Sequence, residues 1–256
     1  MIKINLLILI GFIFPLFLSG CATTQAVDPR DPWESMNRNV QSFNDGLDDY
    51  VMKPVAKGYR WVMPGFADTA VTNVFSNIND IGVTINDSLQ GKFEQSGLDA
   101  ARFLVNTTAG VAGLIDVATM IDLPKHKEDF GQTLGYWGVP TGPYLVLPLF
   151  GPSSPRGVAG LVGDAAMNPV TYIGNPYISG GIFTLKSVDV RADNLGTEKI
   201  ATEAAAFGRY EFFRDAYISK RHSLVLDGNV PEEEDDDYIL DESFDEDENL
   251  APINPF

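Results

Sequence analysis

The chain has 256 residues, of which 45% are hydrophobic, and a formal net charge of −17. Its single cysteine excludes an intrachain disulfide. Its two histidines exclude a His/Cys metal cluster, and no carboxylate loop has calcium-binding spacing, so we expect no metal site. Twelve acidic residues and no basic ones lie between Glu232 and Glu248. A nucleic-acid partner is not expected, because phosphate binding needs a basic face.

The first twenty residues are typical of a bacterial lipoprotein signal peptide. Lys3 precedes an apolar run, Ile4 to Leu18, that is shorter than the ~20 residues of a spanning helix. The run ends at Leu18-Ser19-Gly20-Cys21, which contains the only cysteine. The alternative is an ordinary signal peptide with a cysteine nearby by chance. We expect residues 1–20 to be removed and Cys21 to carry several acyl chains, since one chain anchors only marginally.

Ala22 follows the cysteine, where aspartate usually retains a lipoprotein in the inner membrane, so the sequence favours the outer membrane. Residues 21–30 then form a short linker. After it, Asp31 and Pro32 are typical of the N-cap and first position of a helix. Apolar residues at spacings of three and four continue to Tyr50. Pro54 ends or kinks this helix, and we expect Lys57 to Met63 to be an aromatic-rich connection.

A second amphipathic helix runs from Ala67 to Leu89, and Gly91 ends it. Its other face is rich in Asn and Asp. Asparagine is a mediocre helix former, so this face either serves hydrogen bonding or is merely solvated. Its polar residues are Asn73, Asn77, Asn79, Asp80, Asn86 and Asp87.

Three further segments follow, and none is predicted to span a bilayer, because they are too short or are broken by prolines. A third helix covers Leu98 to Val105. Ala109 to Ile121, with the single charge Asp116, is predicted to be a buried core helix or an interfacial one. Gly157 to Leu185 has the single charge Asp164 and two prolines, so it predicts two short helices. No segment after residue 21 is a transmembrane candidate.

Gly131 to Tyr144 is dense in glycine, proline and aromatic residues and cannot be helical throughout. The last amphipathic helix runs from Thr197 to Leu226, and Gly228 stops it. No long segment alternates with a period of two, so the body is mainly helical. Residues 229–256 form an acidic tail that is disordered and self-repelling, or else docks a basic partner.

The sequence contains no motif of a known catalytic centre. There is no nucleophile elbow, phosphate-binding loop, dinucleotide fingerprint or H-E-x-x-H pattern. His126 lies between two lysines and is expected to be exposed. His222 lies near a helix end, where a cation suits the helix dipole. The protein is therefore not expected to be an enzyme.

Several stretches together resemble one family, the MlaA (VacJ) outer-membrane lipoproteins. The resemblance extends from about residue 30 to 228, and the acidic tail lies outside it. The longest stretches are DPWESMNRNVQSFNDGLDDYVMKPVAKGYRWVMP (31–64), NVFSNINDIGVTINDSLQGKFEQSGLDAARFLVNTTAGVAGLIDVA (73–118) and EDFGQTLGYWGVPTGPYLVLPLFGPSSPRG (128–157). Shorter ones are NPVTYIGNP (168–176) and YEFFRDAYISKRH (210–222).

The resemblance implies an all-α fold for residues 31–228: a ring-shaped bundle of short amphipathic helices around a central channel, embedded in the periplasmic leaflet of the outer membrane. It implies that mislocalised phospholipid leaves the outer leaflet through this channel and passes to the soluble periplasmic carrier MlaC. A porin trimer holds the ring in place. This would maintain lipid asymmetry without cofactors other than the acyl chains on Cys21.

Under this resemblance, apolar surface must point outward as well as inward, so the segments 109–121 and 158–185 are no longer expected to be wholly buried. A headgroup must also be hydrogen-bonded, because burying an unpaired charge is costly. Packing or turn roles remain the alternative for each candidate residue. The candidate channel or gating residues are Asn73, Asn77, Asn86, Gly131, Gly135, Gly138, Thr171, Tyr172, Asn175 and Tyr177.

Two further functions remain open. One is a structural adaptor lipoprotein that binds porin without moving lipid, and the other is a hydrolase with a cryptic site. The missing catalytic motifs weigh against the hydrolase. The amide-rich face in an otherwise apolar domain favours the channel over the adaptor.

Overall fold

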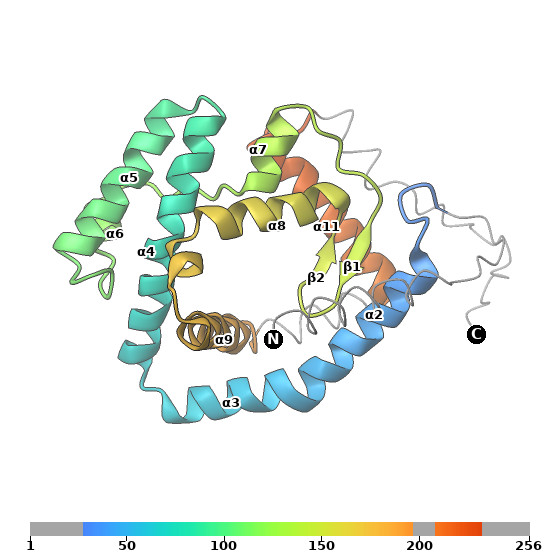
Figure 1. The fold of residues 1–256 in the computed structure, drawn as a ribbon, viewed down its shortest axis with the longest axis horizontal. Helices are drawn as coiled ribbons and strands as arrows, with labels where there is room; N and C mark the ends of the chain where they lie inside the picture. Colours follow the sequence, from blue (N-terminus) through green and yellow to red (C-terminus); the bar gives the residue numbers. More distant parts are fainter. Residues whose placement is uncertain (1–27, 197–207, 232–256) are drawn as a thin grey trace, which may run out of the picture.

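The structure is a computed structural model that describes residues 28–196 and 208–231. Within these ranges the protein is mainly helical, as predicted, with one small two-stranded sheet. Figure 1 shows the helices following one another around a common centre. The signal peptide (1–20), Cys21 with most of the 21–30 linker, residues 197–207 of the last predicted helix and the tail from residue 232 lie outside the described residues.

The described residues form thirteen helices, helical turns and strands. The first half contains α2 (Glu34–Leu47), the π-helix η2 (Asp48–Met52), α3 (Lys53–Val62), α4 (Gly65–Leu89), α5 (Phe93–Thr108) and α6 (Val117–Met120). The second half contains α7 (Phe130–Tyr136), β1 (Leu145–Leu147), β2 (Gly151–Ser153), α8 (Pro155–Met167), the 3₁₀ turn η3 (Pro169–Tyr172), α9 (Pro176–Asp193) and α11 (Arg209–Val225).

Pro54 kinks the first helix rather than ending it. The proline ring clashes with the preceding helical turn and offers no N–H, and the wider π-helical turn η2 directly before α3 accommodates this. Figure 1 shows the resulting bend between α2 and α3. The expected connection from Lys57 to Met63 was wrong, because α3 continues to Val62.

The predicted N-cap Asp31 was also wrong. The helix α2 begins at Glu34 after Trp33, without a side-chain cap. The Asp31 carboxylate is fully buried and instead accepts hydrogen bonds from Asn37 Nδ2, at 2.7 Å, and from the Tyr210 hydroxyl. The carboxylate that would have capped α2 is therefore occupied by Asn37, 6 residues away, and by Tyr210, 179 residues away.

The helices α4 and α5 form an antiparallel hairpin, side by side in Figure 1. Gly91 lies between them at φ 77°, a left-handed conformation that glycine adopts without strain. This confirms the predicted helix to Leu89 and its glycine stop. The predicted third helix is longer than expected, from Phe93 to Thr108.

The apolar helix expected over Ala109 to Ile121 was wrong. Only Val117–Met120 is helical. Val111, Ala112 and Gly113 have φ values of 55°, 58° and 86°, so the chain turns there. The side chain of Asn106 stabilises this turn, because its Oδ1 accepts a hydrogen bond from Ala118 N at 2.8 Å. The apolar composition of the segment therefore reflects an exposed loop and not a helix face.

The two apolar helices predicted after residue 157 are confirmed as α8 and α9, with the prolines 169 and 176 at the breaks. Ser154 caps α8 and Asn175 caps α9, each accepting a backbone N–H. The helix α9 is longer than expected, ending at Asp193, and packs against α3 and α4.

A small apolar core cluster of the described residues lies where α2, β1 and α11 meet. Its buried members are Tyr144, Val146 and Tyr210, with Val40, Tyr217 and Ile218 packed against it. Asn37 joins the elements, because its Nδ2 donates to Tyr144 O at 3.0 Å and its Oδ1 accepts from Val146 N at 2.8 Å. The fold therefore depends on polar contacts as much as on apolar packing.

Candidate functional site

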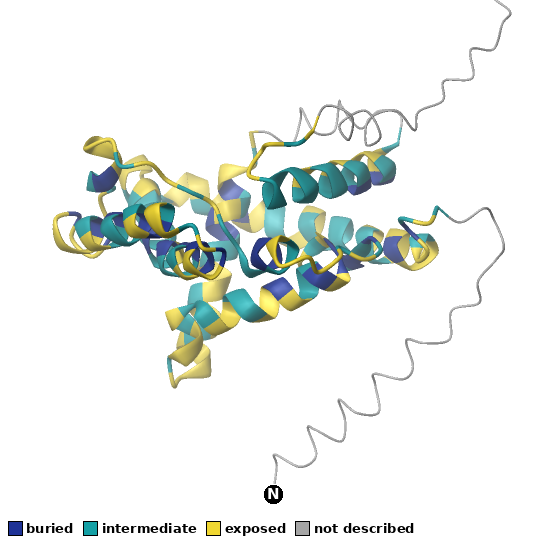
Figure 2. Cartoon of the chain, turned by 90° about the horizontal axis from the view of Figure 1, so that it is seen from above, coloured by how far each residue is buried: buried dark blue, intermediate teal, exposed yellow. Residues whose placement is uncertain are grey.

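The distribution of polarity in the described residues is inverted relative to a water-soluble protein. Eighteen polar or charged residues are buried, against eight apolar or aromatic ones. Charged residues are rarely buried in soluble proteins unless they are paired. In Figure 2 the buried residues form small patches along the helices, and exposed residues border them throughout.

Large apolar side chains lie on the surface. Tyr50, Trp61 and Phe66, on and beside α3, are 86%, 88% and 81% exposed. The same helix carries exposed Lys57 and Arg60. Aromatic residues together with basic ones are typical of a helix lying in a membrane interface, where long basic side chains reach the headgroups. Exposed apolar surface of this extent marks a membrane or protein contact.

Within the ranges 28–196 and 208–231, every helix is too short or too polar to cross a bilayer.

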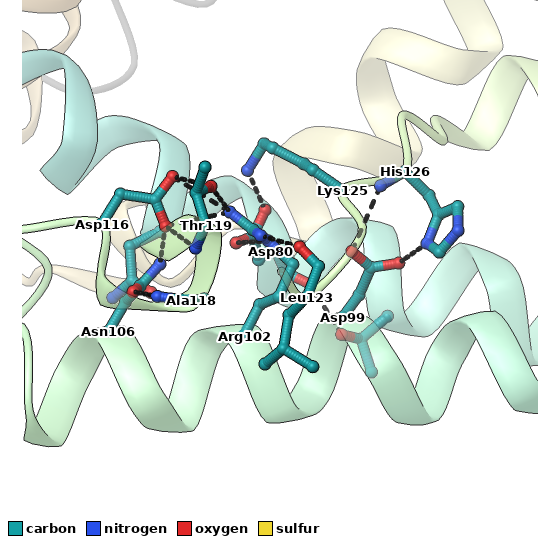
Figure 3. A network of polar contacts seen from close by, with 12 residues as sticks. Asp80, Asp99, Arg102, Asn106, Asp116, Ala118, Thr119, Leu123, Lys125 and His126 are labelled. Carbon is teal, nitrogen blue, oxygen red and sulfur yellow. Dashed lines mark hydrogen bonds and ion pairs between the residues drawn. The ribbon is translucent and has the colours of Figure 1, made fainter. Parts of the chain in front are cut away.

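A buried polar network joins α4, α5 and the segment after α6 (Figure 3). Arg102, 1% exposed, is its centre. Its Nη2 lies 3.0 Å and 3.1 Å from the two carboxylate oxygens of Asp116, and its Nη1 donates to Leu123 O. Asp80, fully buried on α4, accepts from Lys125 Nζ at 2.5 Å. These contacts hold the apolar loop of residues 109–123 against the α4–α5 hairpin.

Asp116 is expected to contribute to the stability of the fold in a way that is lost at acidic pH. Burial alone raises its pKa, but hydrogen bonds from Thr119 and Asn106 and the charge of Arg102 outweigh this and lower the pKa to about 2. The folded pKa is below the unfolded value of about 3.9, so the stabilisation is present above pH 4 and lost between about pH 4 and 2.

We expect Asp116→Asn to remove about 2 kcal/mol of unfolding free energy at pH 6, and the two proteins to converge by pH 2. Denaturant unfolding in detergent at pH 6, 4, 3 and 2 measures this. Parallel curves for the variant and the wild type over the whole range would contradict the assignment.

The three candidate asparagines of α4 have partners inside the protein. Asn73 Nδ2 donates to Leu114 O at 3.0 Å, and Asn77 Nδ2 donates to Thr107 Oγ1 at 2.9 Å. Asn86, fully buried, accepts from Thr133 Oγ1 at 2.8 Å. At these three positions the amide-rich face is hydrogen-bonded to other segments of the protein and is not merely solvated. A role in lipid passage stays a prediction.

The candidate glycines serve close packing and one turn. A Cβ on Gly131 would lie 2.8 Å from Arg221 Nη2, and one on Gly135 would lie 2.7 Å from Val225 Cγ2, so both permit α7 to approach α11. Gly138 has φ 86° just after α7. These positions agree with the turn and packing alternative, and a gating role remains untested.

The remaining candidates lie at or near the connection between α8 and α9. Thr171 Oγ1 donates to Ala165 O at 2.6 Å and the Tyr172 hydroxyl to Ala166 O at 2.5 Å, which satisfies carbonyls at the end of α8. Asn175 caps α9. Tyr177 is 88% exposed, so it is the member of this group most available to a ligand.

A separate cavity of about 160 Å³ lies between β2, α8 and α11. Its lining is amphipathic: Phe150, Pro152 and Leu161 are apolar, while the polar members are Asp129, Ser153, Asp164, Tyr217 and Arg221. The volume is below the ~300–1,000 Å³ of ordinary ligand pockets, so the cavity can take part of a lipid but not a whole one.

An ion pair forms the polar wall of this cavity. Arg221 Nη1 and Nη2 lie 2.6 Å and 2.9 Å from the two oxygens of Asp129. Burial raises the pKa of Asp129, but the hydrogen bond and charge of Arg221 outweigh it and keep the pKa below its ordinary value. Burial raises the pKa of Asp164, whose Oδ1 accepts from Phe130 N at 2.8 Å. The Arg221–Asp129 ion pair and Asp164 thus line the same cavity as the apolar side chains of Phe150 and Leu161.

Sequence reasoning missed the cavity residues and the Arg102 network. One signal was available: Asp116 and Asp164 are single charges in otherwise apolar segments, and such charges need internal partners. The expectation for His126 was wrong. It is only partly exposed, because its Nδ1 lies 2.6 Å from Asp99 Oδ2, a contact between residues 27 positions apart.

Comparison with known proteins identifies the family. The model of the MlaA lipoprotein family matches residues 29–224. An uncharacterised protein of Rickettsia conorii is 34% identical over 68% of this chain and 67% of its own length. The intermembrane phospholipid transport system lipoprotein MlaA of Haemophilus influenzae is 32% identical over 92% of this chain and 97% of its own.

One solved structure, described as the structural basis for maintenance of bacterial outer membrane lipid asymmetry, superposes with a TM-score of 0.68 at 30% identity. It covers 76% of this chain and 98% of its own. The fold, the breadth of these matches and the family model agree, and the chain belongs to the MlaA lipoprotein family.

Proposed function

We propose that this protein helps to maintain the lipid asymmetry of the outer membrane by removing misplaced phospholipids from the outer leaflet. The observation that carries the proposal is the inverted polarity of the fold, with charged groups inside and large aromatic side chains outside. A relative that covers most of the chain is named an intermembrane phospholipid transport system lipoprotein, and this name also supports a role in phospholipid transport.

The proposed location is the periplasmic leaflet of the outer membrane. Acyl chains on Cys21 tether the chain, and exposed side chains such as Tyr50, Trp61 and Phe66 bury themselves among lipid tails. Transfer of such side chains from water to an apolar environment is worth about 1.5–3 kcal/mol each. The helices therefore add to the lipid anchor and need not span the bilayer.

Lipid passage needs polar and apolar surface at the same place, because a headgroup is costly to bury unpaired and tails are costly to expose. The cavity between β2, α8 and α11 supplies both on a small scale: Arg221 is suited to a phosphate oxygen, and Phe150 and Leu161 are suited to a tail. No bond is made or broken in such a passage, so the protein acts without catalysis.

Two partners complete the proposal. A trimeric porin holds the ring in the membrane, and the soluble periplasmic carrier MlaC accepts the extracted phospholipid. The competing function is an adaptor that binds porin without moving lipid. The polar interior supports the channel, because an adaptor anchored by acyl chains has no need for buried charged groups at this density.

A strain lacking this protein tests the proposal. We expect phospholipid to accumulate in the outer leaflet, together with sensitivity to detergent combined with chelator, because misplaced lipid is no longer removed. Outer-leaflet phospholipid is measured by its accessibility to an externally added phospholipase or acyltransferase.

Complementation with the wild-type gene is the positive control and should restore the barrier. Unchanged outer-leaflet composition in the deletion strain, with porin complexes altered, would support the adaptor and refute transport.

A further inference from the structure

Three side chains that can bind a metal meet beside the polar network. Asp87 comes from α4, Asp99 from α5 and His126 from the segment before α7. One ligand atom from each lies within 4.8 Å of the others. His126 Nδ1 is 2.6 Å from Asp99 Oδ2, the contact at the right of Figure 3.

Asp87 is the group that the fold leaves unexplained. It is fully buried, and neither carboxylate oxygen has a hydrogen-bond partner among the described residues. Burying a carboxylate without a partner is strongly unfavourable, so the fold leaves room for a positively charged partner at Asp87.

The lysine and arginine side chains near Asp87 form ion pairs with other carboxylates. Among the described residues, Lys125 pairs with Asp80, Arg102 with Asp116, and Lys92 with both Glu128 and Asp227. In the described ion pairs, Asp99 has only His126 as a partner and Asp87 has none, so neither carboxylate has a lysine or arginine partner. A divalent cation supplies the matching charge.

We propose that Asp87, Asp99 and His126 form a binding site for a divalent transition metal, with Zn²⁺ as the best-suited ion. Two carboxylates and one imidazole match the nitrogen and oxygen ligands of zinc, whereas calcium and magnesium prefer oxygen alone. Bonds of about 2.0–2.2 Å place tetrahedral ligand atoms roughly 3.4 Å apart, so small side-chain rotations close the site.

The position of the site gives the ion a structural role. His126 is 24% exposed in its side chain, which leaves a solvent side for metal entry and a fourth, water ligand. The two aspartates lie on the paired helices α4 and α5. A bound ion therefore ties the α4–α5 hairpin to the segment leading into α7.

The test uses the full chain in detergent, without a histidine tag. The protein is treated with chelator, desalted and titrated with zinc chloride, and bound zinc is measured by elemental mass spectrometry and calorimetry. We expect one zinc per chain and a melting temperature raised by roughly 5–10 °C when free zinc is a hundredfold above Kd. Magnesium and calcium chloride run in parallel and should bind at least tenfold more weakly.

Asp87→Asn and His126→Gln should each weaken zinc binding at least tenfold, while both remain folded. Glu94→Gln, an exposed carboxylate on the same helix as Asp99, is the matched control and should bind like the wild type. Two results would overturn the proposal: no zinc uptake by the wild type, or equal uptake by the wild type and Asp87→Asn.

Discussion

Arg102→Met is expected to lower the free energy of unfolding by about 3–5 kcal/mol, the loss typical of breaking a buried ion pair from one side. The guanidinium is 1% exposed and bonds Asp116, Thr119 and Leu123 O. Methionine keeps an unbranched apolar stem, shorter than that of arginine, and donates no hydrogen bond. Asp116 would lose its charged partner, and Leu123 O its donor. Denaturant unfolding of the protein in detergent measures the change.

Arg38→Met is the matched control. Arg38 also pairs with two carboxylates, Glu34 at 2.7 Å and Glu211, but its side chain is 43% exposed. Exposed ion pairs contribute about 0–1 kcal/mol, so this variant should stay within that range. If Arg38→Met and Arg102→Met lowered the free energy of unfolding equally, burial would not determine how much an ion pair contributes, and the prediction would be wrong.

The second large effect concerns the membrane. In a Cys21→Ala background, replacing Tyr50, Trp61 and Phe66 together by aspartate should release the protein from the outer-membrane fraction. Each aromatic side chain is more than 80% exposed and gains about 1.5–3 kcal/mol on burial in lipid. The three together are worth at least about 4 kcal/mol, a thousandfold change in partition. Vesicle flotation and membrane fractionation measure it.

Leucine at the same three positions is the control, because it keeps apolar surface while removing the rings. The leucine variant should float with vesicles, and the Cys21→Ala parent should as well. Loss of the parent from the membrane would show that the acyl chains alone hold the protein. Retention of the aspartate variant would place these side chains outside the lipid contact.

The local sequence pattern was sufficient to predict the longest helices. The apolar spacing of α4 and its Gly91 stop, and the proline breaks around α8 and α9, follow from interactions within a few residues. Local pattern failed where a distant partner intervened. Asp31 bonds Tyr210 instead of capping a helix, and the apolar segment after Ala109 forms a loop held by Asn106 and Arg102.

The candidate site was predicted less well than the fold. The sequence indicated an amide-rich face on α4 and left open whether it serves hydrogen bonding or is solvated; in the structure Asn73, Asn77 and Asn86 are hydrogen-bonded inside the protein. It gave no indication of the cavity beside Arg221, whose lining residues come from 129 to 221. The spacing of residues along the chain does not show which helices and strands will line the same cavity in the folded protein.

The sequence by itself determined the family, the mainly helical class, the longest helices and the absence of known catalytic motifs. These depend on residue order and local periodicity. Only the tertiary structure decided which polar groups are paired inside and which aromatic side chains remain outside. It also brought Asp87, Asp99 and His126 together. Their positions are 12 and 27 residues apart, so the packing of α4 against α5, and not chain proximity, creates their juxtaposition.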